Sequence, residues 1–142
     1  MIGIVLIGHE RIASEMRAAV EHVVGGQPLM QTIDVLADRD VDALRQQLES
    51  AVAQCDVGEG VLILADMFGG TPCNVAIACV RPGRVELISG INLPLAIKAA
   101  YLRQSIHNLD RLTEQLIEAG RKYMCHATGL MGTVSAGGGA DA

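Results

Sequence analysis

A histidine and an aspartate follow the two most apolar stretches of this chain. His9 comes just after the run of residues 2–7, and Asp66 closes the run of residues 60–66. A turn at the end of a buried strand places an imidazole at the rim of a fold, where chemistry is possible. If the two strand ends meet, the carboxylate can orient the ring through one nitrogen and leave the other as a nucleophile. We expect Asp66 to bond Nδ1 and His9 to carry a phosphoryl group on Nε2.

A glycine-rich segment after Asp66 offers donors for the oxygens of such a group. Phe68, Gly69, Gly70 and Thr71 are the predicted phosphate-binding residues. Glycines let backbone N–H groups approach a ligand closely, and a helix N-terminus favours an anion. Thr71 is a good N-cap and Pro72 a good first helical residue. Taken singly, each feature also fits an ordinary loop histidine or a plain helix start.

Apolar runs and helical spacings alternate along the chain. Strands are expected at about residues 2–7, 28–36, 60–66 and 84–89, and helices at about 12–23, 41–52, 71–81, after Pro94 and at 108–124. This alternation predicts an α/β fold with an open parallel sheet and helices on both faces. The first and third runs are apolar throughout, as interior strands are, while the other two alternate like edge strands. The predicted strand order is 2-1-3-4, which puts His9 and Asp66 at the switch point where ligands bind.

Composition excludes several classes of function. A net charge of −5 and a content of one Phe, two Tyr and no Trp argue against binding of nucleic acid. No apolar run approaches the roughly 20 residues that span a bilayer. The N-terminus lacks the basic segment of a signal peptide, so a cytoplasmic location is expected. The four cysteines form no C-x-x-C pair and no zinc spacing with histidine, so free thiols and no metal or other cofactor are expected.

The predicted organisation is one domain over residues 1–127 and a Gly/Ala-rich tail over residues 128–142. The tail has no clear period, and its last residues, 135–142, are expected to be disordered.

Three segments together resemble a known family. They are Ile7-Gly8-His9, the stretch from Asp66 to Asn74 with its Gly-Gly-Thr-Pro, and the segment of residues 90–94. Over about residues 1–125 the chain resembles the IIA domain of the mannose-type (mannose/fructose/sorbose) bacterial sugar phosphotransferase system. The resemblance implies that His9 accepts a phosphoryl group from the histidine-containing phosphocarrier protein and passes it to a IIB component for sugar uptake. It also implies that Asp66 orients His9, that Thr71 supplies a hydroxyl to the phosphate, and that the chain forms a homodimer.

The rim after the fourth strand has two interpretations. Asn92 and Pro94 start a helix, and with Asn74 they are also the predicted docking residues for partner proteins. Many relatives have a small residue after the histidine, whereas this chain has Glu10, whose carboxylate would repel a phosphoryl group unless it points away or pairs with Arg11.

Other functions remain open at this point. The chain carries no IIB segment, so a stand-alone regulatory protein that acts on a kinase or a transcription regulator is one alternative. The phosphodonor subunit of dihydroxyacetone kinase, which shares the fold, is another. A flavodoxin-like small-molecule binder is the third, although flavin usually requires more stacking aromatics than Phe68 alone.

Overall fold

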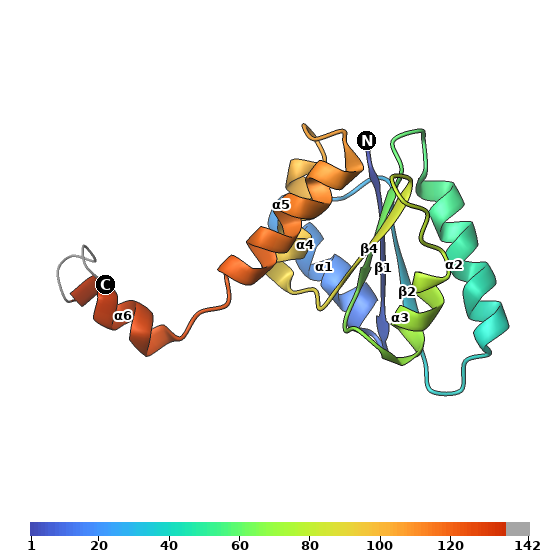
Figure 1. Ribbon diagram of the computed structural model, residues 1–142. Coiled ribbons are helices and arrows are strands. Elements are labelled where there is room, and N and C mark those ends of the chain that lie inside the picture. The colour runs from blue at the N-terminus through green and yellow to red at the C-terminus, as the bar shows by residue number, and fades with distance from the viewer. Residues whose placement is uncertain (136–142) are drawn as a thin grey trace.

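A parallel sheet in the order β2-β1-β3-β4 forms the centre of the molecule (Figure 1). The computed structural model describes residues 1–135. The strands are β1 (Gly3–His9), β2 (Met30–Val35), β3 (Val61–Ala65) and β4 (Val85–Ser89). Every neighbouring pair is parallel. The predicted strand order is therefore confirmed, and β1 and β3 are the interior strands.

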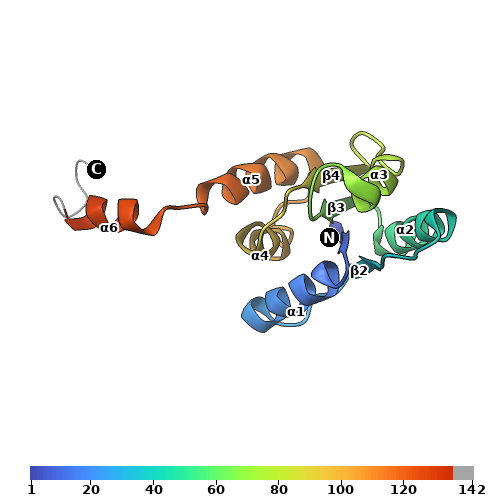
Figure 2. The same ribbon diagram turned by 90° about the horizontal axis from the view of Figure 1, so that it is seen from below.

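Helices cover both faces of the sheet (Figure 2). They are α1 (Ile12–Val24), α2 (Val41–Cys55), α3 (Gly70–Ile77), α4 (Leu93–Leu102) and α5 (Leu109–Lys122). A sixth helix, α6 (Ala127–Ser135), lies apart from the sheet. Alternate residues of β1 serve opposite faces, as the pleat requires. Ile4 and Leu6 pack in the cluster formed with α1, α4 and α5, whereas Val5 and Ile7 pack in the cluster formed with α2 and α3. This double burial explains why the two interior runs are apolar throughout.

The ends of β1 and α3 differ from the sequence prediction. Strand β1 continues through Gly8 to His9, because the pairing with β2 extends to the His9–Val35 pair. Helix α3 ends at Ile77, where tighter turns replace the helical bonds, rather than reaching Pro82.

The segment for which no period was recognised forms α6 over Ala127–Ser135. Figures 1 and 2 both place this helix apart from the rest of the fold. The sequence predicts disorder for residues 135–142: Ser135 is instead the last residue of α6, and residues 136–142 lie outside the described residues.

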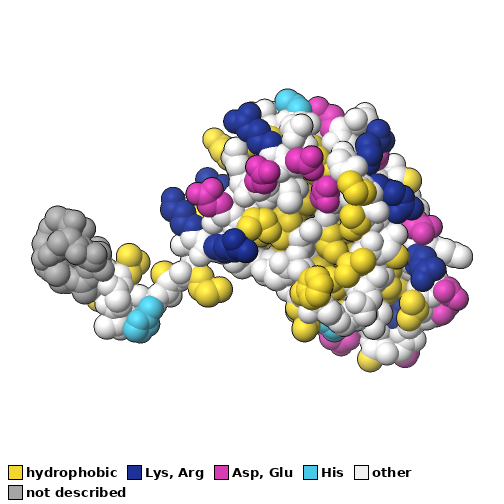
Figure 3. Space-filling view, in the orientation of Figure 1, with side chains coloured by type: hydrophobic (Ala, Val, Ile, Leu, Met, Phe, Trp, Pro, Cys, Tyr) yellow, Lys and Arg dark blue, Asp and Glu magenta, His cyan; other side chains and the backbone are white. Residues whose placement is uncertain are grey.

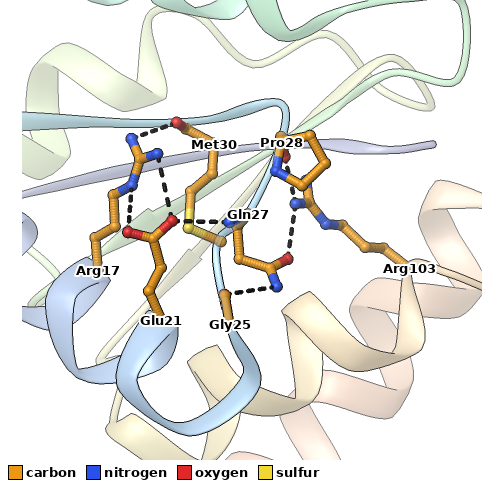
Figure 4. A network of polar contacts seen from close by, with 7 residues as sticks. All are labelled: Arg17, Glu21, Gly25, Gln27, Pro28, Met30 and Arg103. Carbon is orange, nitrogen blue, oxygen red and sulfur yellow. Dashed lines mark hydrogen bonds and ion pairs between the residues drawn. The ribbon is translucent and has the colours of Figure 1, made fainter.

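A buried arginine secures the amino-terminal edge of the sheet (Figure 4). Arg103, just after α4, is completely buried, and its guanidinium donates to the carbonyl oxygens of Ile2 (3.1 Å), Leu29 (3.0 Å) and Pro28 and to Oε1 of Gln27 (3.0 Å). Burial lowers the pKa of Arg103. Its guanidinium is thus held by neutral oxygens, with its Nε unpaired among the described residues.

A second group of polar contacts adjoins the contacts of Arg103 at the same end of the sheet (Figure 4). Arg17 of α1 donates to the carbonyl oxygen of Met30 (2.6 Å) and pairs with Glu21 (3.3 Å). Glu21 in turn accepts from the backbone N–H of Gln27 (2.8 Å). Together these contacts fix the loop between α1 and β2 at the end of the sheet opposite to His9.

Candidate functional site

His9 and Asp66 touch at the carboxyl edge of the sheet, where β1 and β3 end side by side. Oδ2 of Asp66 accepts from the backbone N–H of His9 (2.9 Å) and lies 2.7 Å from its ring Nδ1. Oδ1 of Asp66 accepts from the backbone N–H of Met67 (2.9 Å). The predicted contact between the two strand ends is therefore present, and it uses the predicted ring nitrogen.

The electrostatics of the pair favour an ionised Asp66. Burial by itself would raise the pKa of Asp66, but the hydrogen bonds from the backbone and ring of His9 outweigh it, and the pKa is lowered. An ionised carboxylate accepts a hydrogen bond from Nδ1–H, so in the neutral ring Nε2 is the nitrogen with the free lone pair. The side chain of His9 is 44% exposed and that of Asp66 is 10% exposed. The imidazole of His9 is thus partly exposed, whereas the carboxylate that it contacts is mostly covered.

Two glycines make room for the pair. A Cβ atom on Gly8 would lie 3.3 Å from Oδ2 of Asp66, and one on Gly70 would lie 3.2 Å from Nε2 of His9. Gly70 also has φ +77°, a region that residues with a Cβ rarely adopt. Sequence reasoning missed the role of Gly8, although a single glycine in an apolar strand is a known signal of close approach.

The start of α3 differs from the prediction. Gly69, with φ +88°, is the N-cap, and the helix begins at Gly70. The interpretation of Thr71 as N-cap and of Pro72 as first helical residue is wrong, because two successive glycines with positive φ turn the chain into the helix earlier. The first-turn N–H groups of Gly70 and Thr71 have no acceptor within the helix. Nε2 of His9 lies 3.2 Å from the place that a Cβ atom on Gly70 would take.

The side chain of Thr71 is exposed, and it borders a cavity of about 230 Å³ between α2 and α3. Arg45 and Asn74 line the same cavity. Asn74 is thus placed on the exposed side of α3, next to Thr71. A direct bond from the Thr71 hydroxyl to a phosphoryl group stays a prediction.

Large apolar side chains are exposed next to the histidine. Phe68 is 75% exposed and Met67 is 51% exposed, both in the loop that leads from Asp66 to α3. Figure 3 shows hydrophobic side chains on the lower part of the molecule, where the strands end. A phosphate ligand takes hydrogen-bond donors, which the apolar side chain of Phe68 does not supply, so the predicted role of Phe68 in phosphate binding rests on its backbone N–H.

Two further predicted docking residues lie at the start of α4. Asn92 caps this helix by accepting from the N–H of Leu95 (3.0 Å), and its amide donates to the carbonyl oxygen of Gly120 (2.9 Å). The amide of Asn92 is thus used within the chain, as its interpretation as a helix cap requires. Pro94 lines a mostly apolar groove of about 380 Å³ with Val24 and Tyr101 among its other walls.

The other candidate ligands do not converge. His107 bonds Glu59 (3.1 Å), and His22 and His126 are exposed. The four cysteines are free. Within residues 1–135 no group of three or more His, Cys, Asp or Glu side chains is placed to hold a metal ion. Of the helices that the structure describes, none has the length and apolar character to cross a bilayer.

An open parallel sheet with an imidazole–carboxylate pair at its switch point places the chain in the class of α/β proteins with a candidate site at the carboxyl ends of their strands. The chain belongs to one family of that class, described as the PTS system fructose IIA component, whose sequence model matches residues 3–117. Here PTS stands for the phosphotransferase system. The expected membership in the mannose-type IIA group is confirmed, and the chain is a phosphotransferase-system component.

Individual relatives agree with this assignment. The chain is 29% identical over 122 residues to the mannose-specific EIIAB component of Escherichia coli, covering 85% of this chain and 38% of that protein. It thus spans well under half the length of that relative. It is 29% identical over 121 residues to the sorbose-specific EIIA component of Lacticaseibacillus casei, covering 84% of this chain and 86% of the other. The crystal structure of a phosphotransferase system component EIIA from Streptococcus agalactiae shares the fold, with a TM-score of 0.83, 23% identity and coverage of 91% and 99% of the two chains.

Proposed function

We propose that this protein is a phosphohistidine carrier, in which His9 accepts a phosphoryl group from one protein and donates it to another. The observation that carries the proposal is the pairing of Nδ1 of His9 with Asp66 (2.7 Å), which leaves Nε2 as the ring nitrogen available for attack, on a side chain that is 44% exposed. Phosphoryl transfer depends mainly on positioning and on charge stabilisation, so no metal is needed for the histidine to act as nucleophile.

The proposed step forms one bond and breaks one. The lone pair of Nε2 attacks phosphorus, and the phosphorus–nitrogen bond of the donor's phosphohistidine breaks, returning that electron pair to the donor ring. The proton on Nδ1 of His9 stays in place, so the ring gains positive charge. Asp66, whose pKa is already lowered, remains ionised and stabilises this charge.

The start of α3 is proposed to hold the phosphoryl oxygens. The backbone N–H groups of Gly70 and Thr71 lie in its first turn, and Gly70 adjoins Nε2. The helix dipole adds a partial positive charge there. The hydroxyl of Thr71 and the N–H groups of Phe68 and Gly69 are proposed as further donors.

The proposed donor is the histidine-containing phosphocarrier protein, and the proposed acceptor is a IIB component for sugar uptake. With these partners, the transfer is proposed to take place in the cytoplasm. The exposed Phe68, Met67 and Asn74 offer a contact surface beside the histidine. The mannose- and sorbose-specific names of the relatives support sugar uptake as the purpose of the transfer.

The test is incubation with labelled phosphoenolpyruvate, enzyme I and the phosphocarrier protein. Wild type is expected to take up one acid-labile phosphoryl group, and His9→Ala is expected to take up none. His22→Ala is the matched control, because His22 is an exposed histidine on α1. An unlabelled wild-type protein, or equal labelling of His9→Ala, would rule out the carrier function. A labelled protein that transfers nothing to a IIB component would favour the regulatory alternative.

We further propose that two chains pair as a homodimer. Helix α6 lies apart from its own sheet (Figure 1), with Leu130 55% exposed and Met131 67% exposed. The groove beside Pro94, whose wall Tyr101 is 61% exposed, is a second uncovered apolar surface. Light scattering on the full chain should give twice the monomer mass. The Leu130→Ser/Met131→Ser variant should give the monomer, and a monomeric wild type would contradict the pairing.

A further inference from the structure

The residue after the histidine has an unfavourable backbone conformation. Glu10 has φ +50°, in the left-handed region that a side chain with a Cβ disfavours. Its side chain is exposed and forms no hydrogen bond or ion pair among the described residues, with Arg11 or otherwise. Such a conformation persists only where the surrounding structure fixes it.

Residues of strand β2 make the contacts that hold Glu10 and the start of α1 in place. The carbonyl oxygen of Val35 accepts from the N–H of Glu10 (3.0 Å). Helix α1 then begins two residues later without a cap of its own, because the side chain of its N-cap residue Arg11 makes no capping bond. Asp34 of β2 takes that place: its Oδ1 accepts from the N–H of Ser14 (3.0 Å), and its Oδ2 accepts from the Ser14 hydroxyl (2.6 Å).

The turn from His9 into α1 is therefore held from both sides. On one side Oδ2 of Asp66 receives both the backbone N–H and the ring of His9. On the other side Val35 and Asp34 hold Glu10 and the first turn of α1. Because one carboxylate oxygen serves two groups of His9, a small shift of the turn disturbs both bonds together.

We propose that Asp34 is a positioning residue for His9. By capping α1 from the neighbouring strand, its carboxylate holds the left-handed turn at Glu10 and so keeps the imidazole on Asp66 with Nε2 beside Gly70. Asp34 touches no reacting atom in this scheme. The effect on transfer rests on the proposed carrier function, whereas the effect on the ring can be measured without it.

The first measurement compares Asp34→Ala with Asn108→Ala. Asn108 caps α5 by accepting from the N–H of Arg111 (2.9 Å), so its variant also loses a helix cap but at another site. Asp34→Ala should change the ¹⁵N shifts of the His9 ring toward tautomer exchange and slow phosphorylation about tenfold in kcat, with KM for the donor unchanged. Asp34→Asn, which keeps an acceptor for Ser14, should recover most of the rate. Ser14→Ala should give a smaller loss and serves if Asp34→Ala does not fold.

The second measurement is a double-mutant cycle with Glu10→Gly. Glycine adopts a positive φ freely, so the turn then needs less support. The rate loss of Asp34→Ala should shrink to about twofold in the Glu10→Gly background. Equal losses in both backgrounds, or His9 ring shifts that match those of Asn108→Ala, would overturn the inference. Absence of phosphorylation in wild type would instead overturn the carrier function, while the ring shifts would still test Asp34.

Discussion

A Cβ atom on Gly70 would lie 3.2 Å from both Nε2 and Cε1 of His9. The start of α3 is thus in contact with the side of the imidazole that Asp66 leaves free. A side chain at position 70 would compete with the proposed phosphoryl group for this space, which makes Gly70 part of the proposed site rather than only a turn residue.

Gly70→Ala tests this contact. The variant should lose about 1 kcal/mol of folding free energy because φ is +77°, and it should also lose most of its phosphorylation because the added methyl group crowds Nε2. Gly83→Ala is the matched control, since Gly83 has the same φ of +77° and open space around it. Denaturant unfolding and initial rates of labelling measure the two effects. Equal rates for the two variants would refute a role for the contact.

Asp66→Asn tests the orienting carboxylate. An amide can donate to Nδ1 and thereby stabilise the wrong tautomer, so we expect phosphorylation to slow by about 100-fold or more. Asp56→Asn is the control, because Asp56 also accepts two backbone N–H groups, from Gly58 and Gly60, and also has a lowered pKa, but it lies at the other end of the sheet. That variant should lose stability and keep its rate.

The lowered pKa of Asp66 also predicts how stability depends on pH. A carboxyl group whose pKa is lower in the folded state stabilises the fold above its unfolded value, about 3.9, and loses this effect as pH falls through the folded value. The difference in free energy of unfolding between wild type and Asp66→Asn should therefore shrink as pH falls below about 4. A difference that stays constant or grows from about pH 4 downward would contradict the assignment of an ionised Asp66.

Phe68→Ala tests the exposed apolar surface beside His9. Phe68 is 75% exposed, so its loss should leave the free energy of unfolding nearly unchanged. If the ring contacts the donor protein, KM for that protein should rise about tenfold at unchanged kcat. Val57→Ala, at a residue that is 60% exposed at the other end of the sheet, should change neither constant. A fall in kcat alone would assign Phe68 to the phosphate instead.

Arg103→Met tests the buried guanidinium. The change removes the guanidinium donor from the carbonyl oxygens of Ile2, Leu29 and Pro28, of which Leu29 keeps the N–H of Ile4 (3.0 Å), so the free energy of unfolding should fall by about 3 kcal/mol. Arg111→Met, at an exposed arginine on α5, should cost less than about 0.5 kcal/mol. Urea unfolding measures both. Labelling of His9 per folded molecule should be unchanged in both variants, because Arg103 contacts residues at the amino-terminal ends of the strands, opposite to His9.

The sequence by itself determined the sheet and the meeting of its two reactive residues. Residues 2–7 and 60–66 are apolar on both sides of the strand, and only interior strands of a covered parallel sheet need that pattern. Once these two runs are neighbours, parallel pairing brings His9 and Asp66 to the same edge, as the register between Ile7 and Ala65 does. The spacing of apolar residues along the chain predicts this arrangement, because it shows which positions are buried, and the tendency to be buried belongs to each residue type by itself.

Tertiary structure decided the contacts that depend on the direction in which a side chain points, rather than on whether it is buried. The start of α3 at Gly70, the approach of Gly70 to Nε2 and the capping of α1 by Asp34 all join segments whose relative orientation no local pattern encodes. The complete burial of Arg103 is a further case, since an arginine is normally expected at the surface. Each of these features follows from where a side chain points after the sheet has assembled, which is why they became visible only in three dimensions.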